Sequence, residues 1–301
     1  MVRTSKLPGR AAGSTSAKEW LEPPQPQDLV ITLLADNVRH RKDEVWSGGL
    51  VRQLGDFGFA AGASRVALAR LVQRGLISRV KSGRMVAYRL TDRSELLMRE
   101  GDRRIFGLGN NDFTDHVITV LWHTLGEEHR LKRARLARRL RFLGFGPVQD
   151  ATWIAAGDHQ EELVDIISDL GIADFSGALV GHPPESLNLR PLIERTWDLP
   201  ALQERYSAFV RMFESVGTAS WRCRLSDEQA FRVRTRMMHT FRQFPSLDPS
   251  IKPGSPQRTR AISLFREAYD SLREGAHRHF DLIVARPQAD HLICDPRDEW
   301  H

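Results

Sequence analysis

Cysteine is scarce in this chain, which has 301 residues and only Cys223 and Cys294. The two lie far apart without partners at metal-ligand spacing, which argues against a disulfide framework or a zinc site and indicates a cytoplasmic protein. No apolar run approaches the ~20 residues that span a bilayer, so we expect no membrane partner. The first residues also lack the continuous apolar core of a signal peptide.

Motifs of catalysis are absent as well. The chain has no Gly-rich phosphate loop, nucleophile elbow or paired motif for acyl transfer, and we predict neither catalytic residues nor a cofactor. Two of its histidines, His277 and His279, are two residues apart, which is a poor spacing for metal ligands on one helix face. An acidic turn is the simpler interpretation of Asp112, Asp115 and His116. The alternative is that they belong to the site of a metal-dependent nuclease. We therefore predict no bound metal and no enzyme.

Acidic residues are missing from one long segment. Ala61–Leu90 contains seven Lys/Arg and no Asp or Glu. The wider range 28–104 has fifteen Lys/Arg and nine Asp/Glu, so its excess of six equals the +6 of the whole chain. Cations that neutralise phosphates release condensed counterions, and this concentration of charge therefore favours duplex DNA as partner.

The basic segment has the order helix, stop, strand, turn, strand. Residues 63–74 are predicted to be helical, with Ala67, Leu68 and Leu71 on one face and a stop at Gly75. Strands are expected over 77–80 and 85–90, joined by a tight turn that carries a cation at each end. Together with predicted helices at 28–38 and 50–57, this order predicts a winged helix-turn-helix.

In such a fold the third helix enters the major groove and its N-terminal residues reach base edges. Arg65 is the best candidate for bidentate contact with guanine. Arg70, Lys81 and Arg84 are expected to meet phosphates. The alternative is a winged helix that binds protein. The residues predicted to form the DNA-binding surface are Arg65, Val66, Ala69, Arg70, Arg74, Lys81 and Arg84.

Beyond this segment, a linker is expected over 107–112. The alternation of strand-like and helical runs that follows, including a helix over 160–170, predicts a βαββαβ ferredoxin-like domain. A helical domain comes next, with helices expected over 199–213, from Ser226 to about Gln243 and over 260–280. The fold class is thus α+β and multidomain. Seven Lys/Arg and no acid within Arg130–Arg141 form either a second DNA-contacting strip or a solvated helix face. We predict a flexible tail (1–27), a winged-helix domain (28–106), a ferredoxin-like domain (113–182), a helical effector and dimerisation domain (190–283) and a C-terminal tail (284–301).

A set of short motifs is spaced across all three predicted domains, between about Leu29 and Phe280. The motifs are Glu44-Val45-Trp46, Arg65-Val66-Ala67-Leu68-Ala69-Arg70-Leu71, Gly75-Leu76, Leu140-Arg141-Phe142-Leu143-Gly144-Phe145-Gly146-Pro147, Trp153-Ile154, Trp197-Asp198-Leu199, Tyr206, Phe209, His239-Thr240-Phe241-Arg242-Gln243-Phe244-Pro245 and Asp248-Pro249. In these motifs and their order, the chain resembles the PaaX family of bacterial repressors of aromatic-acid catabolism.

The resemblance implies a homodimeric repressor that binds a palindromic operator and is released by an aryl-acyl-CoA thioester, typically phenylacetyl-CoA. His239 and Arg242, three apart on one helix face, are candidates for binding this effector. The alternative is a structural pair that holds the following Phe244-Pro245 turn. A constitutive DNA-binding protein without an effector is the competing function.

Two departures from the family pattern bear on these expectations. The family often has Thr and Ser where this chain has Val66 and Ala69, so the operator sequence is expected to differ. A longer Leu/Pro-rich segment of the family is reduced here to 250–256. If that segment shapes the effector pocket, the effector differs as well.

Overall fold

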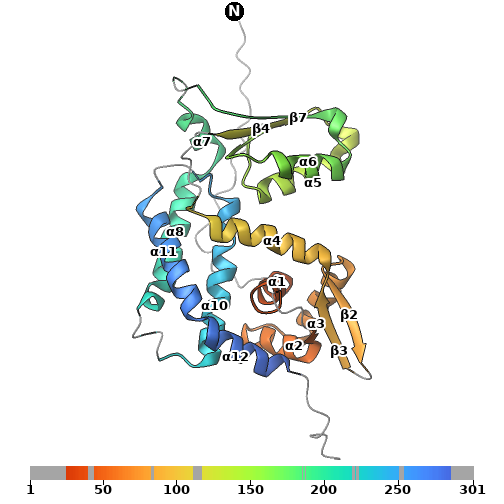
Figure 1. The fold of residues 1–301 in the computed structure, drawn as a ribbon, viewed down its shortest axis with the longest axis vertical. Helices are drawn as coiled ribbons and strands as arrows, with labels where there is room; N and C mark the ends of the chain where they lie inside the picture. The colour runs from red at the N-terminus through yellow and green to blue at the C-terminus, as the bar shows by residue number, and fades with distance from the viewer. Residues whose placement is uncertain are drawn as a thin grey trace, which may run out of the picture. The chain divides into compact units, whose positions relative to one another are not determined.

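The computed structural model describes residues 25–39, 44–82, 85–110, 117–184, 186, 188–218, 221, 224–250 and 254–285 (Figure 1). They fall into two compact units. Unit 1 is drawn from Gly107–Glu214 and Gln243–Leu264, and unit 2 from Pro24–Phe106, Ser215–Arg242 and Phe265–His301. The predicted helical segment 190–283 therefore contributes residues to both units. The mixed α+β class with antiparallel sheets and a helical C-terminal region is confirmed.

Unit 2 combines elements from both ends of the chain. Its elements are α1 (Pro26–Asn37), β1 (Val45–Trp46), α2 (Ser47–Asp56), α3 (Ala61–Gln73), β2 (Ile77–Ser82), β3 (Met85–Leu90), α4 (Asp92–Gly107, except its last residue), α10 (Asp227–Phe241), α12 (Arg273–Val284) and the end of α11 (Pro256–Ser271). The sheet order is β1-β3-β2, with antiparallel pairs throughout. The β2–β3 hairpin pairs Ile77 with Leu90 and Ser82 with Met85.

Helix α1 is central to unit 2 and is seen end-on in Figure 1, between α3 and α10. Leu29, Val30 and Leu33 are each fully buried, so the helix is covered on more than one side. Phe231 of α10 and Phe280 of α12 belong to the same hydrophobic cluster as these leucines. The N-terminal helices therefore share one continuous core with helices from nearly two hundred residues further along the chain.

Helix α12 approaches the backbone of α2 closely at Gly49. A Cβ built on Gly49 would be 2.5 Å from the carbonyl oxygen of Ile283. Gln53 of α2 donates from its side-chain amide to the carbonyl oxygen of Phe280, 3.3 Å away. Glycine at position 49 thus permits the approach of α12, and α2 is fixed on that side.

Unit 1 contains the predicted ferredoxin-like domain. It runs β4 (Ile118–His123), α5 (Arg130–Phe142), β5 (Gly146–Gln149), β6 (Thr152–Ala156), α6 (Gln160–Leu170) and β7 (Ser176–Gly181). The sheet order β5-β6-β4-β7 is antiparallel throughout, which confirms the βαββαβ arrangement. Leu136 and Leu140 of α5 and Leu163 of α6 pack with Leu121 and Trp153 of the sheet.

The rest of unit 1 is helical. It contains α7 (Arg190–Thr196), α8 (Leu199–Phe213) and the first part of α11, with short 3-10 turns including Phe244–Ser246. Tyr206 of α8 stacks on Phe244 at 4.1 Å, and its hydroxyl donates to Asp248 at 2.5 Å. The pair of Phe244 and Pro245 is buried here, and Asp248 also accepts from Arg258 at 2.6 Å.

Three expected boundaries were wrong. Gly48 and Gly49 lie inside α2, which begins at Ser47, because the close contact with α12 favours glycine within the helix. The expected linker from Gly107 begins later, since α4 extends to that residue. The single helix expected over 260–280 is two helices with a break at Leu272, where α12 turns to pack on α10 and α2. Neither Pro nor Gly marks this break.

Candidate nucleic-acid interface

The turn between α2 and α3 fixes the orientation of α3. Helix α2 ends at Asp56, and Gly58 follows with a φ of 88°, a left-handed conformation that favours glycine. The carbonyl oxygen of Leu54 accepts from the amides of both Phe57 and Phe59. Helix α3 then begins at Ala61 and packs on α1 and α2.

One face of α3 is buried and the opposite face is open to solvent. Ser64, Ala67, Leu68 and Leu71 form the buried face. The exposed face consists of Arg65, Val66, Ala69, Arg70, Gln73 and Arg74, and Val66 is 52% exposed. Five of these were predicted, and the structure brings them together. Gln73 was missed, although its spacing of four from Ala69 places it on the same face.

The cations of this face are not neutralised by the described part of the chain. Arg65, Arg70 and Arg74 form no ion pair with any described residue. Free guanidinium groups on a helix surface can hydrogen-bond phosphate oxygens or the edge of guanine. The face therefore offers three guanidinium donors, with the uncharged side chains of Val66, Ala69 and Gln73 between them.

The N-terminus of α3 adds a second kind of donor. Its cap residue, Ala60, is extended and supplies no side-chain hydrogen bond to the first turn. The hydroxyl of Ser64 turns back to the carbonyl oxygen of Ala60 at 3.1 Å. The exposed amides of the first turn are thus free of side-chain caps, and the helix dipole favours an anion at such a site.

The β2–β3 hairpin supplies further cations. Lys81 is exposed near the tip, and Arg79 is exposed on the same strand, a residue that the sequence interpretation did not single out. Arg89, by contrast, is bonded to Glu44 at 2.5 Å. The predicted site residue Arg84 lies outside the described residues, and so does Gly83 of the expected turn.

His239 and Arg242 lie at the end of α10, against α1, and do not join the exposed face of α3. Arg242 Nη1 donates to Thr32 Oγ1 at 2.7 Å and to the carbonyl oxygen of Asp28 at 3.3 Å. Thr32 Oγ1 lies 3.1 Å from His239 Nδ1. Burial, followed by the Arg242 charge, lowers the pKa of His239 to about 4. The imidazole is thus neutral near pH 7, and its effector role stays a prediction.

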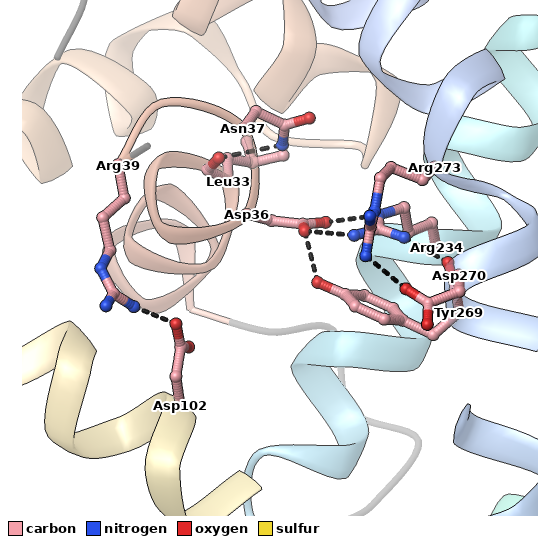
Figure 2. A network of polar contacts seen from close by, with 9 residues as sticks. All are labelled: Leu33, Asp36, Asn37, Arg39, Asp102, Arg234, Tyr269, Asp270 and Arg273. Carbon is pink, nitrogen blue, oxygen red and sulfur yellow. Dashed lines mark hydrogen bonds and ion pairs between the residues drawn. The ribbon is translucent and has the colours of Figure 1, made fainter. Parts of the chain in front are cut away.

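Sequence reasoning missed the polar network in the middle of unit 2 (Figure 2). Asp36 of α1 accepts from Arg234 Nε at 2.9 Å and from Arg234 Nη2 at 2.7 Å. Tyr269 donates its hydroxyl to the same carboxylate, and the Arg234 guanidinium lies 3.5 Å from the Tyr269 ring centroid. The side chains of Asp36 and Arg234 are only 4% and 3% exposed. This network joins α1 to α10 and α11.

Little in the local sequence pattern predicts this network. Arg232, Arg234 and Arg236 alternate along α10 in a run that looks solvated, and only one of them is buried. Arg232 instead reaches the carbonyl oxygen of Asp56 at 2.6 Å. A buried guanidinium at position 234 becomes evident only when α1 and α11 are packed around α10.

Other candidates can be placed only in part. Within the described ranges no group of His, Cys, Asp or Glu is arranged to hold a metal ion. His279 lies 3.7 Å from Asp56 across α12 and α2. Asp112, Asp115, His116 and both cysteines fall outside the described residues. No helix in the described part of the chain is both long and apolar enough to cross a membrane.

A helix with open guanidinium groups beside a basic hairpin is the kind of surface that suits a polyanion such as a nucleic acid. Three models of known protein families match successive parts of the chain. The model of PaaX-like protein matches residues 25–94, that of the PaaX protein central Cas2-like domain 114–189, and that of the PaaX-like protein C-terminal domain 197–282. The chain belongs to the PaaX family.

Individual proteins are more distant. The Transcriptional repressor PaaX of Escherichia coli (strain K12) is 24% identical over 228 residues, which covers 74% of this chain and 71% of that protein. The solved structure of Uncharacterized protein Rv0674 from Mycobacterium tuberculosis has 20% sequence identity and a TM-score of 0.49, covering 85% of this chain and 99% of that one. Similarity at that TM-score supports no further conclusion.

Proposed function

We propose that this protein is a DNA-binding transcriptional repressor and that residues 28–106 act as a winged helix-turn-helix. The observation that carries the proposal is the exposed face of α3, where three arginines have no acidic partner within the described chain. The name of the Escherichia coli relative, a transcriptional repressor, supports the same function. The role is regulatory and not enzymatic.

In this proposal α3 is the recognition helix and lies in the major groove. Arg65, in its N-terminal half, donates to the edge of a guanine, while Val66 and Ala69 contact thymine methyl groups. Arg70, Arg74 and Lys81 bind phosphates and thereby position the helix. The uncapped amides at the start of α3 bind a further phosphate.

Two finer parts of the proposal rest on the family resemblance. The protein acts as a homodimer, so its operator has two half-sites separated by about one helical turn or a multiple of it. An aryl-acyl-CoA thioester such as phenylacetyl-CoA releases the protein from DNA by binding one arrangement of the dimer more tightly than the other. The target is an aromatic-acid catabolic operon, as the resemblance implies.

His239 and Arg242 are proposed to take part in this response. Both contact Thr32 of α1, the helix against which α3 packs. An effector group that competes for Arg242 would therefore weaken the support of the recognition helix. A panel of acyl-CoA thioesters in a thermal-shift assay tests this, because a ligand selective for the native state raises its stability. A flat response together with tight DNA binding would favour a repressor without effector.

The DNA-binding proposal is tested by binding to the duplex upstream of the gene and to a mixed-sequence duplex, at several salt concentrations. Arg65→Ala should cost roughly 1–3 kcal/mol on the upstream duplex and relax the preference at one position. Lys81→Ala should weaken binding to both duplexes equally and reduce the slope of log K against log salt by about 1.

Arg278→Gln is the matched control. Arg278 is also exposed and belongs to unit 2, but its guanidinium is bonded to Asp227 at 2.8 and 2.9 Å. We expect it to bind DNA as the unaltered protein does, since its charge is already paired and an exposed ion pair contributes little to stability. If Arg65→Ala and Lys81→Ala also retain unaltered binding at every salt concentration, the assignment of α3 and the hairpin is wrong.

A further inference from the structure

Helix α5 (Arg130–Phe142) of the ferredoxin-like domain carries seven Lys/Arg and no acid. Its buried face consists of Leu136 and Leu140, which pack on the sheet. The opposite arc is exposed and is formed by Arg130, Leu131, Ala134, Arg135, Arg138, Arg141 and Phe142. At 100° per residue these positions fall within less than half of the helix circumference, so they form one continuous surface.

The simplest explanation of so basic a helix is that its cations balance acids nearby. Three of them do have partners. Arg139 is bonded to Asp169 of α6 at 2.7 Å, and Lys132 donates to the carbonyl oxygen of Gly171 at 2.9 Å. Arg133 is bonded to Glu127 at 2.6 Å, just before the helix. These contacts account for the side of α5 that faces α6 and for its N-terminal turn.

The cations of the exposed arc are different. The side chains of Arg130, Arg135 and Arg138 have no hydrogen bond or ion pair with any described residue. Arg141 lies over the Trp153 ring, 5.3 Å from its centroid, and has no acidic partner in the described chain. Internal charge balance therefore explains the paired cations of α5 and leaves the exposed ones unexplained.

Large apolar side chains lie among these arginines. Leu131 is 71% exposed and Phe142 is 42% exposed. From Arg130 to Arg141 the helix advances about 16 Å, and duplex DNA places a phosphate every ~3.4 Å of axis on each strand. Four cations over this length can thus reach several phosphates on one side of a groove, with the apolar side chains in contact with sugars.

We propose that the exposed arc of α5 is a second DNA-contacting surface, which binds the phosphate backbone of a duplex without reading its sequence. The inference rests on the proposed DNA-binding function for the identity of the partner. It gives the ferredoxin-like domain a role in DNA binding, in addition to the roles of α3 and the β2–β3 hairpin. Because it acts only on phosphates, it adds affinity and salt dependence but no base preference.

The test uses the full-length protein and a mixed-sequence duplex about four helical turns long, on which sequence reading has no effect. The dependence of the binding constant on salt is measured for the variant Arg130→Gln/Arg135→Gln/Arg138→Gln. Its matched control is Lys132→Gln/Arg133→Gln/Arg139→Gln, which removes the same charge from the same helix at the paired positions.

We expect the exposed-arc variant to reduce the slope of log K against log salt by about 2–3, since each lost phosphate contact removes about 0.9. The control should reduce it by about 1 or less. Equal slopes for the two variants would show that only net charge matters, and an unchanged slope in the exposed-arc variant would point to an acidic protein partner. Either outcome overturns the proposal. The single changes Arg135→Gln and Arg138→Gln, each expected to cost about 0.9 in slope, replace the triple variant if it unfolds.

Failure of this inference is distinguishable from failure of the proposed function. If Lys81→Ala reduces the slope and the exposed-arc variant does not, α3 and the hairpin bind DNA and α5 does not. If only the exposed-arc variant reduces it, α5 binds DNA and the winged-helix assignment is wrong.

Discussion

Replacing Asp36 by alanine should destabilise unit 2 more than any surface change in it. Asp36 accepts two hydrogen bonds from Arg234, at 2.7 and 2.9 Å, and a third from the hydroxyl of Tyr269 (Figure 2). Without the carboxylate, the Arg234 guanidinium remains buried with no counter-charge. Removing one partner of a buried pair costs about 3–5 kcal/mol, because the other charge is left uncompensated in a medium of low dielectric constant.

The size of this loss of stability depends more on the burial of the two charges than on the attraction between them. The side chains of Asp36 and Arg234 are 4% and 3% exposed, so water cannot replace the lost contacts. Burial, and then the Asp36 carboxylate, raise the pKa of Tyr269 well above its usual value. The phenol therefore stays protonated and donates to Asp36, and Tyr269→Phe should cost about 1.5–3 kcal/mol, the range for a hydrogen bond to a charged group.

Urea unfolding of the full chain gives the overall loss, and hydrogen exchange of the α1 and α10 amides shows where it arises. The double variant Asp36→Leu/Arg234→Met should recover most of the stability, since apolar residues often replace a buried ion pair without loss. The matched control is Arg39→Ala. Arg39 follows α1 and pairs with Asp102 of α4, and this pair is less buried than that of Asp36 and Arg234, at 14% and 28% exposure. Its loss should cost about 1 kcal/mol. A loss below about 1 kcal/mol for Asp36→Ala, or no faster exchange in α1, would refute the reasoning.

Two further predictions concern α10 and α2. The pKa of His239 is lowered to about 4. Between pH ~6.5 and about pH 4 the unfolded chain therefore binds a proton that the folded chain does not, and the folded state loses stability as the pH decreases. His239→Asn keeps an acceptor for Thr32. Thermal melting should show that this variant loses about 2 kcal/mol less stability than the unaltered protein between pH 7 and about pH 5. Equal losses in the two proteins would contradict this. Gly49→Ala should cost about 1–3 kcal/mol, because the new Cβ meets the Ile283 carbonyl oxygen at 2.5 Å. Gly55→Ala on the same helix, with nothing within 4 Å, is its control and should not destabilise. Similar melting temperatures for both glycine variants would disprove the close contact.

Much of the fold follows from local pattern. Helix α6 (Gln160–Leu170) and helix α8 (Leu199–Phe213) have the bounds predicted from their apolar spacing. The start of α10 was predicted at Ser226, and Ser226 and Gln229 form a capping box there. These elements were predictable because their caps and apolar faces lie within one stretch of sequence.

The missed features depend on distant segments. The two-residue strand β1 exists only because Val45 and Trp46 pair with β3, some forty residues later. The break at Leu272 has no local signal, since it is set by packing of α12 on α10 and α2. In the same way, the spacing of His239 and Arg242 predicts a shared face but not that Thr32 of α1 occupies it.

The sequence by itself determined the α+β class, the βαββαβ domain, the family and the exposed basic face of α3. Each of these depends on periodicity, capping and charge within short segments, which any correct fold must respect. Only the tertiary structure decided that α1 is enclosed by helices from both ends of the chain and that Arg234 is buried against Asp36. It also decided which cations of α5 are paired and which are exposed. Burial and pairing depend on what packs against a helix, and that information is distributed over residues far apart in the chain.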